Sequence, residues 1–129
     1  MNTSSLVKIV IPIYTTKINF FEEISLQRVC QILHSYPLVV IKPQSLDLSP
    51  ILEKYPALTI ENFADDYFRS IAGYNRLMLS EEFYRRFEDN EYILICQLDA
   101  YIFRDELTEW CEKGYDYIGA PWLVRPIYR

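Results

Sequence analysis

The amino-acid sequence predicts an α/β domain, in which a mostly parallel sheet of about five strands carries helices on both faces. Stretches with the apolar spacing of strands alternate along the chain with stretches that have the spacing of helices. The expected strands are nearly continuous apolar runs, which is typical of strands that are buried on both faces. With 129 residues, of which 50% are hydrophobic and 24% charged, the chain has the size and composition of one soluble globular domain.

The first half of the chain is expected to contribute three strands and two helices. Pro12 should stand near the end of the first strand, because proline cannot donate to a ladder of backbone hydrogen bonds. Asn19, followed three positions later by Glu22, has the spacing of a capping box and predicts the start of the first helix. Ser49 is a candidate N-cap of the second helix, with Pro50 at its first helical position. The expected strands are 6–14, 37–43 and 58–63, and the expected helices are 20–33 and 49–55.

The second half is expected to contribute a long helix, the strongest strand, a short helix and a last strand. The long helix starts at Asp66 or Ser70 and ends at Phe87. Its candidate core residues, chosen by helical spacing, are Ile71, Leu77, Met78, Phe83 and Phe87. Asp105 should cap the short helix, which Gly114 should end. The expected strands are 92–103 and 115–123.

The overall charge and the length of the apolar runs exclude several classes of protein. A net charge of −5 and a pI of about 4.9 argue against a nucleic-acid-binding protein, which needs a basic face. No apolar run approaches the roughly 20 residues that span a bilayer, and the N-terminal stretch lacks the basic region of a signal peptide. The three cysteines have no C-x-x-C spacing, which fits reduced thiols and a cytoplasmic location. His34, the single histidine, and these scattered cysteines do not provide the ligand set of a zinc site.

Two polar residues interrupt the apolar strand that is expected over 92–103. Because side chains alternate between the two faces of a strand, Gln97 and Asp99 would lie on the same face. A carboxylate that is buried alone costs several kcal/mol or loses its charge. Asp99 therefore either lies at a strand end that is open to solvent and ligand, or is buried with a partner such as Arg76 or a tyrosine hydroxyl.

The carboxyl ends of the expected strands form the candidate ligand site, because ligands of open parallel sheets bind there, where the strand order reverses. The polar pair Gln97 and Asp99 would lie at this edge. The residues at and just after the ends of the first two strands are Tyr14, Thr15, Thr16, Lys42, Pro43, Gln44 and Ser45. The sequence has three glycines and no glycine-rich phosphate loop, so the charge of a bound diphosphate would be met by a metal ion at Asp99, or by Arg76 and Lys42. Trp122 is equally a candidate for a substrate wall and for a packed side chain.

Several stretches of the chain resemble nucleotide-diphospho-sugar glycosyltransferases of the GT-A type. Their Asp-x-Asp strand and the helix after it are similar to ILICQLDAYIFRDELTEW, and their opening strand is similar to VKIVIPIY. The helix in which many of them carry a nucleotide-contacting Arg or Asn is similar to GYNRLML. A bacterial family of unknown function, found in surface-polysaccharide gene clusters and regarded as glycosyltransferase-like, resembles the chain more closely. The blocks that carry this second resemblance are ENFADDYFRSIAGYNRLMLSEEFYRRF, YILICQLDAYIF and GYDYIGAPW.

The resemblance implies a Rossmann-like three-layer sandwich of the GT-A type with a site for a sugar-nucleotide donor. Asp99 would coordinate a divalent Mn²⁺ or Mg²⁺ that bridges the diphosphate and stabilises the leaving group. Gln97 would take the place of the first acidic residue of the motif. Tyr14 and Thr15 would border the base and the ribose, with Arg76 close to the diphosphate or the base. The donor-binding residues are thus expected to be Tyr14, Thr15, Lys42, Arg76, Gln97, Asp99 and Trp122.

The chain departs from the GT-A pattern in two ways. Only one acid of the motif is present, and one carboxylate holds Mg²⁺ or Mn²⁺ weakly unless phosphates complete the ligand shell. The acceptor-binding half that usually follows the fifth strand has no counterpart, so 1–129 is expected to be a single nucleotide-sugar-binding domain, the N-terminal part of a larger GT-A fold. We expect this domain to serve bacterial surface-polysaccharide synthesis in the cytoplasm or at the inner membrane, with a glycan or a lipid-linked acceptor.

Two other functions remain open. The chain could be a truncated, non-catalytic Rossmann-like module that binds a nucleotide or a partner protein. An apolar patch over 122–128 would favour this alternative and could support a homodimer. The chain could also be a different α/β enzyme, such as a hydrolase or a phosphotransferase, although it contains neither a G-x-S-x-G elbow nor a P-loop.

Overall fold

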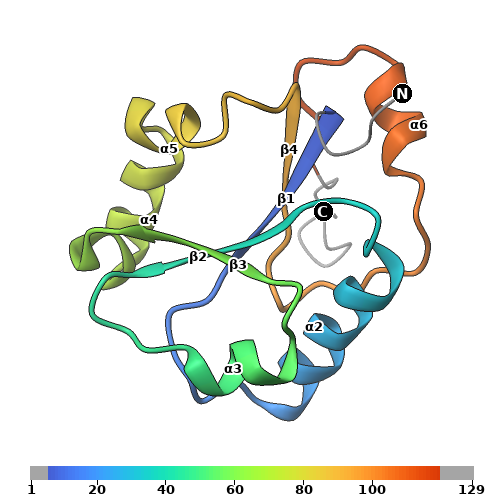
Figure 1. Cartoon of the computed structure of the whole chain (residues 1–129). Helices are drawn as coiled ribbons and strands as arrows, with labels where there is room; N and C mark the ends of the chain where they lie inside the picture. Colours follow the sequence, from blue (N-terminus) through green and yellow to red (C-terminus); the bar gives the residue numbers. More distant parts are fainter. Residues whose placement is uncertain (1–5, 120–129) are drawn as a thin grey trace, which may run out of the picture.

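The centre of the fold is a parallel sheet with the strand order β3-β2-β1-β4 (Figure 1). The structure, a computed structural model, describes residues 6–119. Its strands are β1 Val7–Pro12, β2 Leu38–Pro43, β3 Thr59–Phe63 and β4 Tyr92–Ile95. In β1, Ile9 lies opposite Leu38 of β2 on one side and opposite Leu94 of β4 on the other. The predicted parallel α/β fold is confirmed, with four strands within the described residues instead of about five.

Helices cover both faces of the sheet, as predicted. The helices are α2 Phe20–Ile32, α3 Ser49–Lys54, η1 Asp65–Phe68 (a 3-10 helix), α4 Ile71–Met78, α5 Glu81–Arg85 and α6 Leu107–Glu112. In Figure 1, α4 and α5 lie to the left of the sheet, and α2 and α6 lie to the right. Between residues 6 and 119, no helix has both the length and the apolar character that crossing a bilayer requires.

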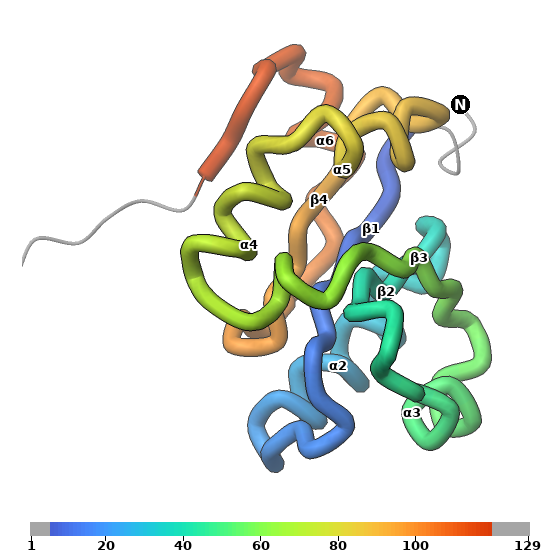
Figure 2. Tube along the Cα trace, turned by 90° about the vertical axis from the view of Figure 1, so that its left-hand side faces the viewer, coloured from blue at the N-terminus to red at the C-terminus, as the bar shows by residue number. Residues whose placement is uncertain are grey.

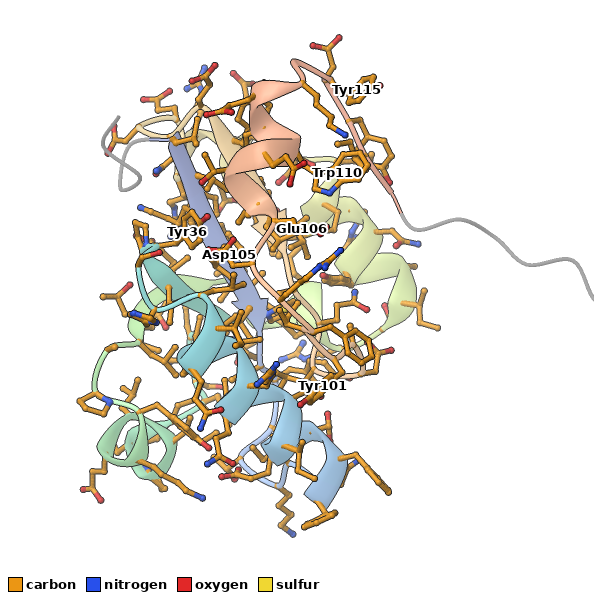
Figure 3. All side chains as sticks on the ribbon, turned by 90° about the vertical axis from the view of Figure 1, so that its right-hand side faces the viewer. Tyr36, Tyr101, Asp105, Glu106, Trp110 and Tyr115 are labelled. Atoms are coloured by element: carbon orange, nitrogen blue, oxygen red, sulfur yellow. The ribbon has the colours of Figure 1, made fainter. Side chains whose placement is uncertain are left out.

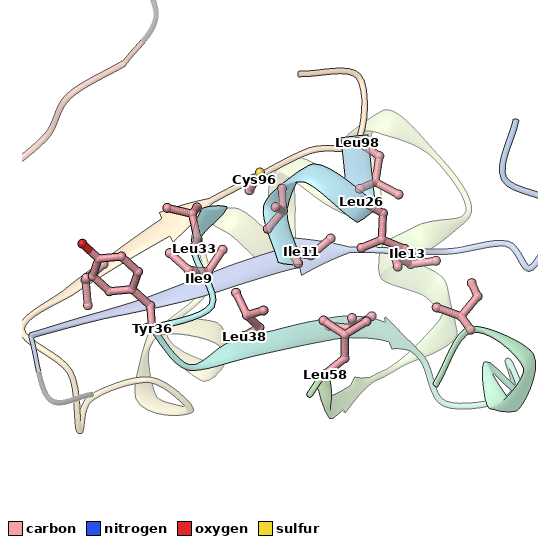
Figure 4. Packing of buried hydrophobic residues seen from close by; sticks show 14 of the residues in the cluster. Ile9, Ile11, Ile13, Leu26, Leu33, Tyr36, Leu38, Leu58, Cys96 and Leu98 are labelled. Atoms are coloured by element: carbon pink, nitrogen blue, oxygen red, sulfur yellow. The ribbon is translucent and has the colours of Figure 1, made fainter. Parts of the chain in front are cut away.

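Each face of the sheet has its own hydrophobic cluster. On the face covered by α2, α3 and α6, Leu26 of α2 and its C-cap residue Leu33 pack with Ile9 and Ile11 of β1 (Figure 4). The cluster on the opposite face is smaller and joins the sheet to α4 and α5. Its buried members are Val10, Val39, Ile41, Phe63, Leu77, Phe83 and Phe87. Because both faces are packed, β1 and β2 are almost completely buried, which explains their continuous apolar sequences.

The first two helices begin close to the predicted positions. The capping box of α2 is confirmed: Asn19 Oδ1 accepts the Glu22 N–H at 2.8 Å, and Glu22 Oε1 accepts the Asn19 N–H at 3.0 Å. Ser49 as the N-cap of α3 is wrong by one residue, because the cap is Leu48 and Ser49 is already helical. The Asp47 carboxylate accepts the Ser49 N–H at 2.9 Å, so the chain turns into the helix one residue earlier.

The single long helix expected up to Phe87 is wrong, because the structure has the three short helices η1, α4 and α5 there. Two serine side chains cap the new helix starts: Ser70 Oγ accepts the Gly73 N–H at 3.0 Å, and Ser80 Oγ accepts the Phe83 N–H at 3.1 Å. Because of these breaks, the predicted core residues do not all face the sheet. Ile71 is 83% exposed, whereas Leu77, Phe83 and Phe87 are buried and Met78 is partly buried.

The strand predicted over 92–103 is also wrong beyond Ile95, where β4 ends. Its last ladder-like bond joins the Cys96 N–H to the carbonyl of Val10 at 2.8 Å. The chain then turns, and the Ala100 N–H donates to the Gln97 carbonyl at 3.1 Å. The later apolar residues Leu98 and Ile102 do not extend the strand. They pack into the hydrophobic cluster on the α2 face, which removes their side chains from water.

The last described segment carries α6 and is tied to α2 and β2. Tyr36 Oη donates to Asp105 Oδ1 at 2.9 Å, an approach that Figure 3 shows from the side of α6. Asp105 does not stand at the N-cap as predicted, because the cap is Glu106; the Asp105 carboxylate accepts the Leu107 N–H at 3.0 Å instead. Gly114 follows α6 with a φ of +75°, as the predicted C-terminal stop requires. The predicted strand 115–123 is absent from 115–119, and its remainder lies outside the described residues.

Candidate functional site

A cavity of about 550 Å³ lies at the carboxyl ends of β1 and β4. The strand order reverses at this pair, because the chain runs from β1 to β2 and β3 on one side and returns to β4 on the other. The cavity therefore occupies the switch point where open parallel sheets bind ligands. Its lining residues come from the end of β1, the first turn of α2, the turn after β4, and the segment from η1 into α4. Figure 2 traces the course of these segments. The lining residues are Pro12, Tyr14, Glu22, Phe68, Arg69, Ser70, Ile71, Tyr74, Asn75, Gln97, Leu98 and Asp99.

Asp99 is an exposed carboxylate on the turn that follows β4. Within residues 6–119, no side chain or backbone group donates a hydrogen bond to this carboxylate, and no cation pairs with it. The sequence leaves two alternatives for Asp99: a position open to solvent at a strand end, or burial with a partner. The structure has the first. The reason is the early end of β4, which places Asp99 in a turn beyond the ladder, where water can solvate its charge.

Gln97 and Tyr74 connect two walls of the cavity. Gln97 Nε2 donates to Tyr74 Oη at 3.4 Å, which links the turn after β4 to α4. Burial raises the pKa of the Tyr74 hydroxyl, although the hydrogen bond from Gln97 acts in the opposite direction. Tyr74 therefore keeps its proton at neutral pH and can donate it in a hydrogen bond to a ligand oxygen. Tyr14, which is 64% exposed, adds an aromatic ring at the end of β1.

The structure thus brings three of the predicted donor-binding residues, Tyr14, Gln97 and Asp99, to one cavity. Thr15 follows Tyr14 but does not line the cavity; its Oγ1 accepts the Lys17 N–H at 3.1 Å. Trp122 lies outside the described residues.

Lys42 and Arg76, the two cations expected to meet a diphosphate, lie elsewhere. Lys42 is buried, and its Nζ donates to the carbonyls of Pro43 at 3.1 Å and Leu46 at 2.6 Å. Arg76 lines a second hollow of about 400 Å³. There its guanidinium lies 5.9 Å from the centre of the Tyr67 ring.

The wall formed by Arg69, Ser70 and Tyr74 was not among the predicted site residues. It depends on Gly73, where a Cβ atom would meet the backbone oxygen of Asp66 at only 2.5 Å. This missing side chain lets α4 approach η1 closely, which brings the wall to the cavity. A glycine in the interior of an expected helix, in a chain with three glycines, is the sequence signal that could have indicated this close approach.

The lining residues do not fit a divalent cation held by the protein alone. Within residues 6–119, no three side chains of His, Cys, Asp or Glu come together in a group that could hold a metal ion. Two carboxylates line the cavity, and one oxygen of Glu22 is engaged in the capping box of α2. Asp99 remains as one ligand, whereas Mg²⁺ requires six oxygen ligands in octahedral geometry.

The fold is shared with solved structures of a GT-A-type glycosyltransferase, TarS of S. aureus. TarS 1–349 matches with a TM-score of 0.52 and 18% sequence identity over 91% of this chain and 38% of that chain. The same protein in complex with UDP-GlcNAc gives a TM-score of 0.52 over 91% of this chain and 37% of that chain, again at 18% identity. A longer TarS structure gives a TM-score of 0.51 and 18% identity, with 83% of this chain and 19% of that chain covered. The chain therefore spans well under half the length of these structures.

The chain belongs to the family described as "Protein of unknown function (DUF5672)", whose model matches residues 57–127. This match includes β3, the α4 wall, β4 and the turn with Asp99. A comparison with curated proteins found no match. The comparisons thus show a member of this family with a glycosyltransferase-like α/β fold.

Proposed function

We propose that the cavity between β1 and β4 binds the nucleotide-diphospho-sugar donor of a glycosyltransferase. The observation that carries the proposal is the position of the Asp99 carboxylate, which has no hydrogen-bond donor or cation among residues 6–119, at the switch point of a GT-A-type sheet. Complexes of TarS 1–349 with UDP-GlcNAc and with UDP support this class of ligand. The reaction would break the bond between the anomeric carbon and the diphosphate and form a bond to an acceptor oxygen.

The side chains around the cavity suit the parts of such a donor. Asp99 accepts hydrogen bonds from ribose or sugar hydroxyls, which offer donors to a carboxylate. The exposed ring of Tyr14 provides a flat apolar surface for the base. Tyr74, held by Gln97, donates its hydroxyl proton to a ligand oxygen. We assign the domain to the synthesis of bacterial surface polysaccharides, on a cytoplasmic glycan or lipid-linked acceptor that other parts of the enzyme would bind.

A titration with sugar nucleotides tests this proposal. The wild-type chain is titrated by calorimetry and thermal shift with UDP-, GDP-, dTDP- and CMP-sugars, with and without Mn²⁺. We expect one nucleotide class to raise the Tm, and Asp99→Ala to weaken its binding about 10-fold or more, because a charged hydrogen-bond acceptor is lost. Asp89→Ala is the matched control, since Asp89 is an exposed acid that lines neither hollow. Absence of binding by every nucleotide, or equal affinity of Asp99→Ala, would contradict the proposal.

A second candidate function is a partner-binding module without transfer activity. The observation that favours it is the exposure of apolar side chains after β4, where Figure 3 shows Tyr101, Trp110 and Tyr115 on the outside of the α6 side. The exposed apolar residues of this region are Tyr101, Phe103, Trp110, Tyr115, Tyr117 and Ile118. Size-exclusion chromatography with light scattering would show a dimer if this surface pairs two copies, whereas a monomer would argue against self-association.

A further inference from the structure

We infer that Arg69, and not a protein-held metal ion, neutralises the diphosphate of the bound nucleotide, so that binding requires no divalent cation. This inference rests on the proposed function and specifies how the same site meets the ligand charge. It names a residue outside the predicted donor-binding set and replaces the metal that the GT-A resemblance implies.

The charge of the cavity wall requires a cation for a phosphate ligand. Glu22 and Asp99 contribute two carboxylates, and a nucleoside diphosphate adds further negative charge. Among the described residues that line the cavity, Arg69 alone is cationic. A diphosphate would otherwise meet only like charges, which repel it at the short distances of a binding site.

Arg69 lines the cavity and has free donors for this role. Its guanidinium forms an ion pair with Asp66, and the two side chains are 70% and 72% exposed. Such an exposed pair is weak and exchanges readily for a stronger partner. A guanidinium has five N–H donors, and the ion pair with Asp66 uses one nitrogen, Nη1. The remaining donors can bind two phosphate oxygens side by side.

The backbone around Arg69 is held firmly, so its side chain starts from a defined position. Arg69 links η1 to Ser70, the N-cap of α4. The absence of a Cβ at Gly73, where one would meet the Asp66 carbonyl oxygen at 2.5 Å, lets these two helices pack closely against each other. A cation on a fixed segment loses less conformational entropy on binding than one on a mobile loop.

The other cations of the predicted site cannot easily replace Arg69. Lys42 Nζ is committed to two backbone carbonyls in a buried position. Arg76 faces the second hollow, with Glu82 and Asp66 among its neighbours there.

The experiment compares nucleotide binding in EDTA and in Mn²⁺ by titration calorimetry. The probes are UDP and uridine, or the corresponding pair for the nucleotide class that binds best. We expect the wild type to bind UDP in EDTA with an affinity within about 3-fold of that in Mn²⁺. Arg69→Gln should weaken UDP binding about 10- to 100-fold and leave uridine binding unchanged, because only the diphosphate contact is lost. Arg69→Lys should lie between the two, since a lysine keeps the charge without the planar fork.

Two control variants separate the phosphate contact from a general loss of charge. Arg85→Gln removes a cation from a comparable exposed ion pair, Arg85 with Glu81 on α5, and should leave UDP binding unchanged. Asp66→Asn removes the partner of Arg69 and should bind UDP at least as tightly as the wild type. Circular dichroism and the Tm verify that each variant is folded.

The possible failures are distinguishable. If no nucleotide binds under any condition, the proposed function fails and this inference with it. If UDP binds only in the presence of Mn²⁺, or if Arg69→Gln binds UDP as the wild type does, the inference is overturned while the proposed function stands.

Discussion

The two strands that flank β1 differ in burial although both pair with it in parallel. Every residue of β2 is buried, whereas all four residues of β4 are only partly buried. β2 has a further strand, β3, on its outer side, whereas β4 is the edge strand of the sheet within residues 6–119. The β2 side therefore supplies stability, and the β4 side leaves room for the cavity beyond its carboxyl end. We call residues 6–63, with β1, β2 and β3, the packed half, and residues 64–119, with α4 and β4, the open half.

The largest expected effect is a difference between matched truncations in the two strands. Ile41→Ala in β2 removes a fully buried side chain and should lower the free energy of unfolding by about 2–5 kcal/mol. Ile95→Ala in β4 removes a partly buried side chain and should cost about half as much. Urea unfolding measures both. Equal costs would show that β4 is as well packed as β2 and would remove the basis of the comparison.

Gly73→Ala should destabilise the open half by about 1–3 kcal/mol, because the added Cβ would meet the Asp66 carbonyl oxygen at 2.5 Å and force α4 away from η1. The same movement should weaken nucleotide binding. Ala72→Gly, on the exposed side of the same helix, is the control and should cost only about 0.5–1 kcal/mol through helix propensity. Urea unfolding and calorimetry give the two readouts. A Gly73→Ala variant with wild-type stability would show that the close approach is not required.

Arg28 of α2 fastens the open half to the packed half. Its Nε donates to the Ile102 carbonyl and its Nη2 to the Phe103 carbonyl, both at 2.8 Å. Arg28→Met should lower the free energy of unfolding by about 1–2 kcal/mol, because it removes these two charge-assisted hydrogen bonds. Amide hydrogen exchange in 97–103 should become faster, because the bonds hold the chain that follows the cavity turn. Gln27→Met, an exposed position of α2, is the control. Unchanged exchange in 97–103 would mean that packing alone holds this segment.

The smallest expected effect concerns pH and lies in the packed half. Glu23 of α2 accepts hydrogen bonds from Lys54 and Tyr55, which lower the pKa of its carboxyl group. Because the folded pKa lies below the unfolded value, this stabilisation is present above pH 4.5, the ordinary value, and is lost as the pH falls through the folded pKa.

Glu23→Gln should therefore lower the free energy of unfolding by about 0.5–1 kcal/mol at pH 7, and this difference should vanish in strong acid. Thermal unfolding from pH 2 to 7 measures the difference, with Glu53→Gln on α3 as the control. A difference that does not change with pH would assign the effect to packing instead of charge.

The sequence predicts the packed half better than the open half, for a physical reason. Strands buried on both faces must be apolar almost throughout, so β1 and β2 are visible as nearly continuous runs that end at or beside prolines. After β4, apolar residues such as Leu98 and Ile102 belong to a loop that packs on the sheet. Hydrophobicity reports burial and not backbone conformation, so the strand is predicted too long.

The candidate site is predictable to the extent that its polar residues interrupt an apolar run. Gln97 and Asp99 are found in this way, and Tyr14 follows from its place after the first strand. Arg69 and Tyr74 are missed because their position depends on the break between η1 and α4, which apolar spacing does not reveal. Lys42 stands at a strand end as expected, but neighbouring carbonyls satisfy its charge.

The pairing of Val7 with Tyr92 joins the first strand of the described chain to its last strand. During synthesis, β1, β2 and β3 can associate as soon as they leave the ribosome, whereas one edge of β1 stays unpaired until β4, at Tyr92–Ile95, has also been made. Contacts between such distant segments form late, since a long loop must close first. A nascent or prematurely terminated chain would therefore carry an unpaired apolar edge, open to association with other chains, and would have no cavity.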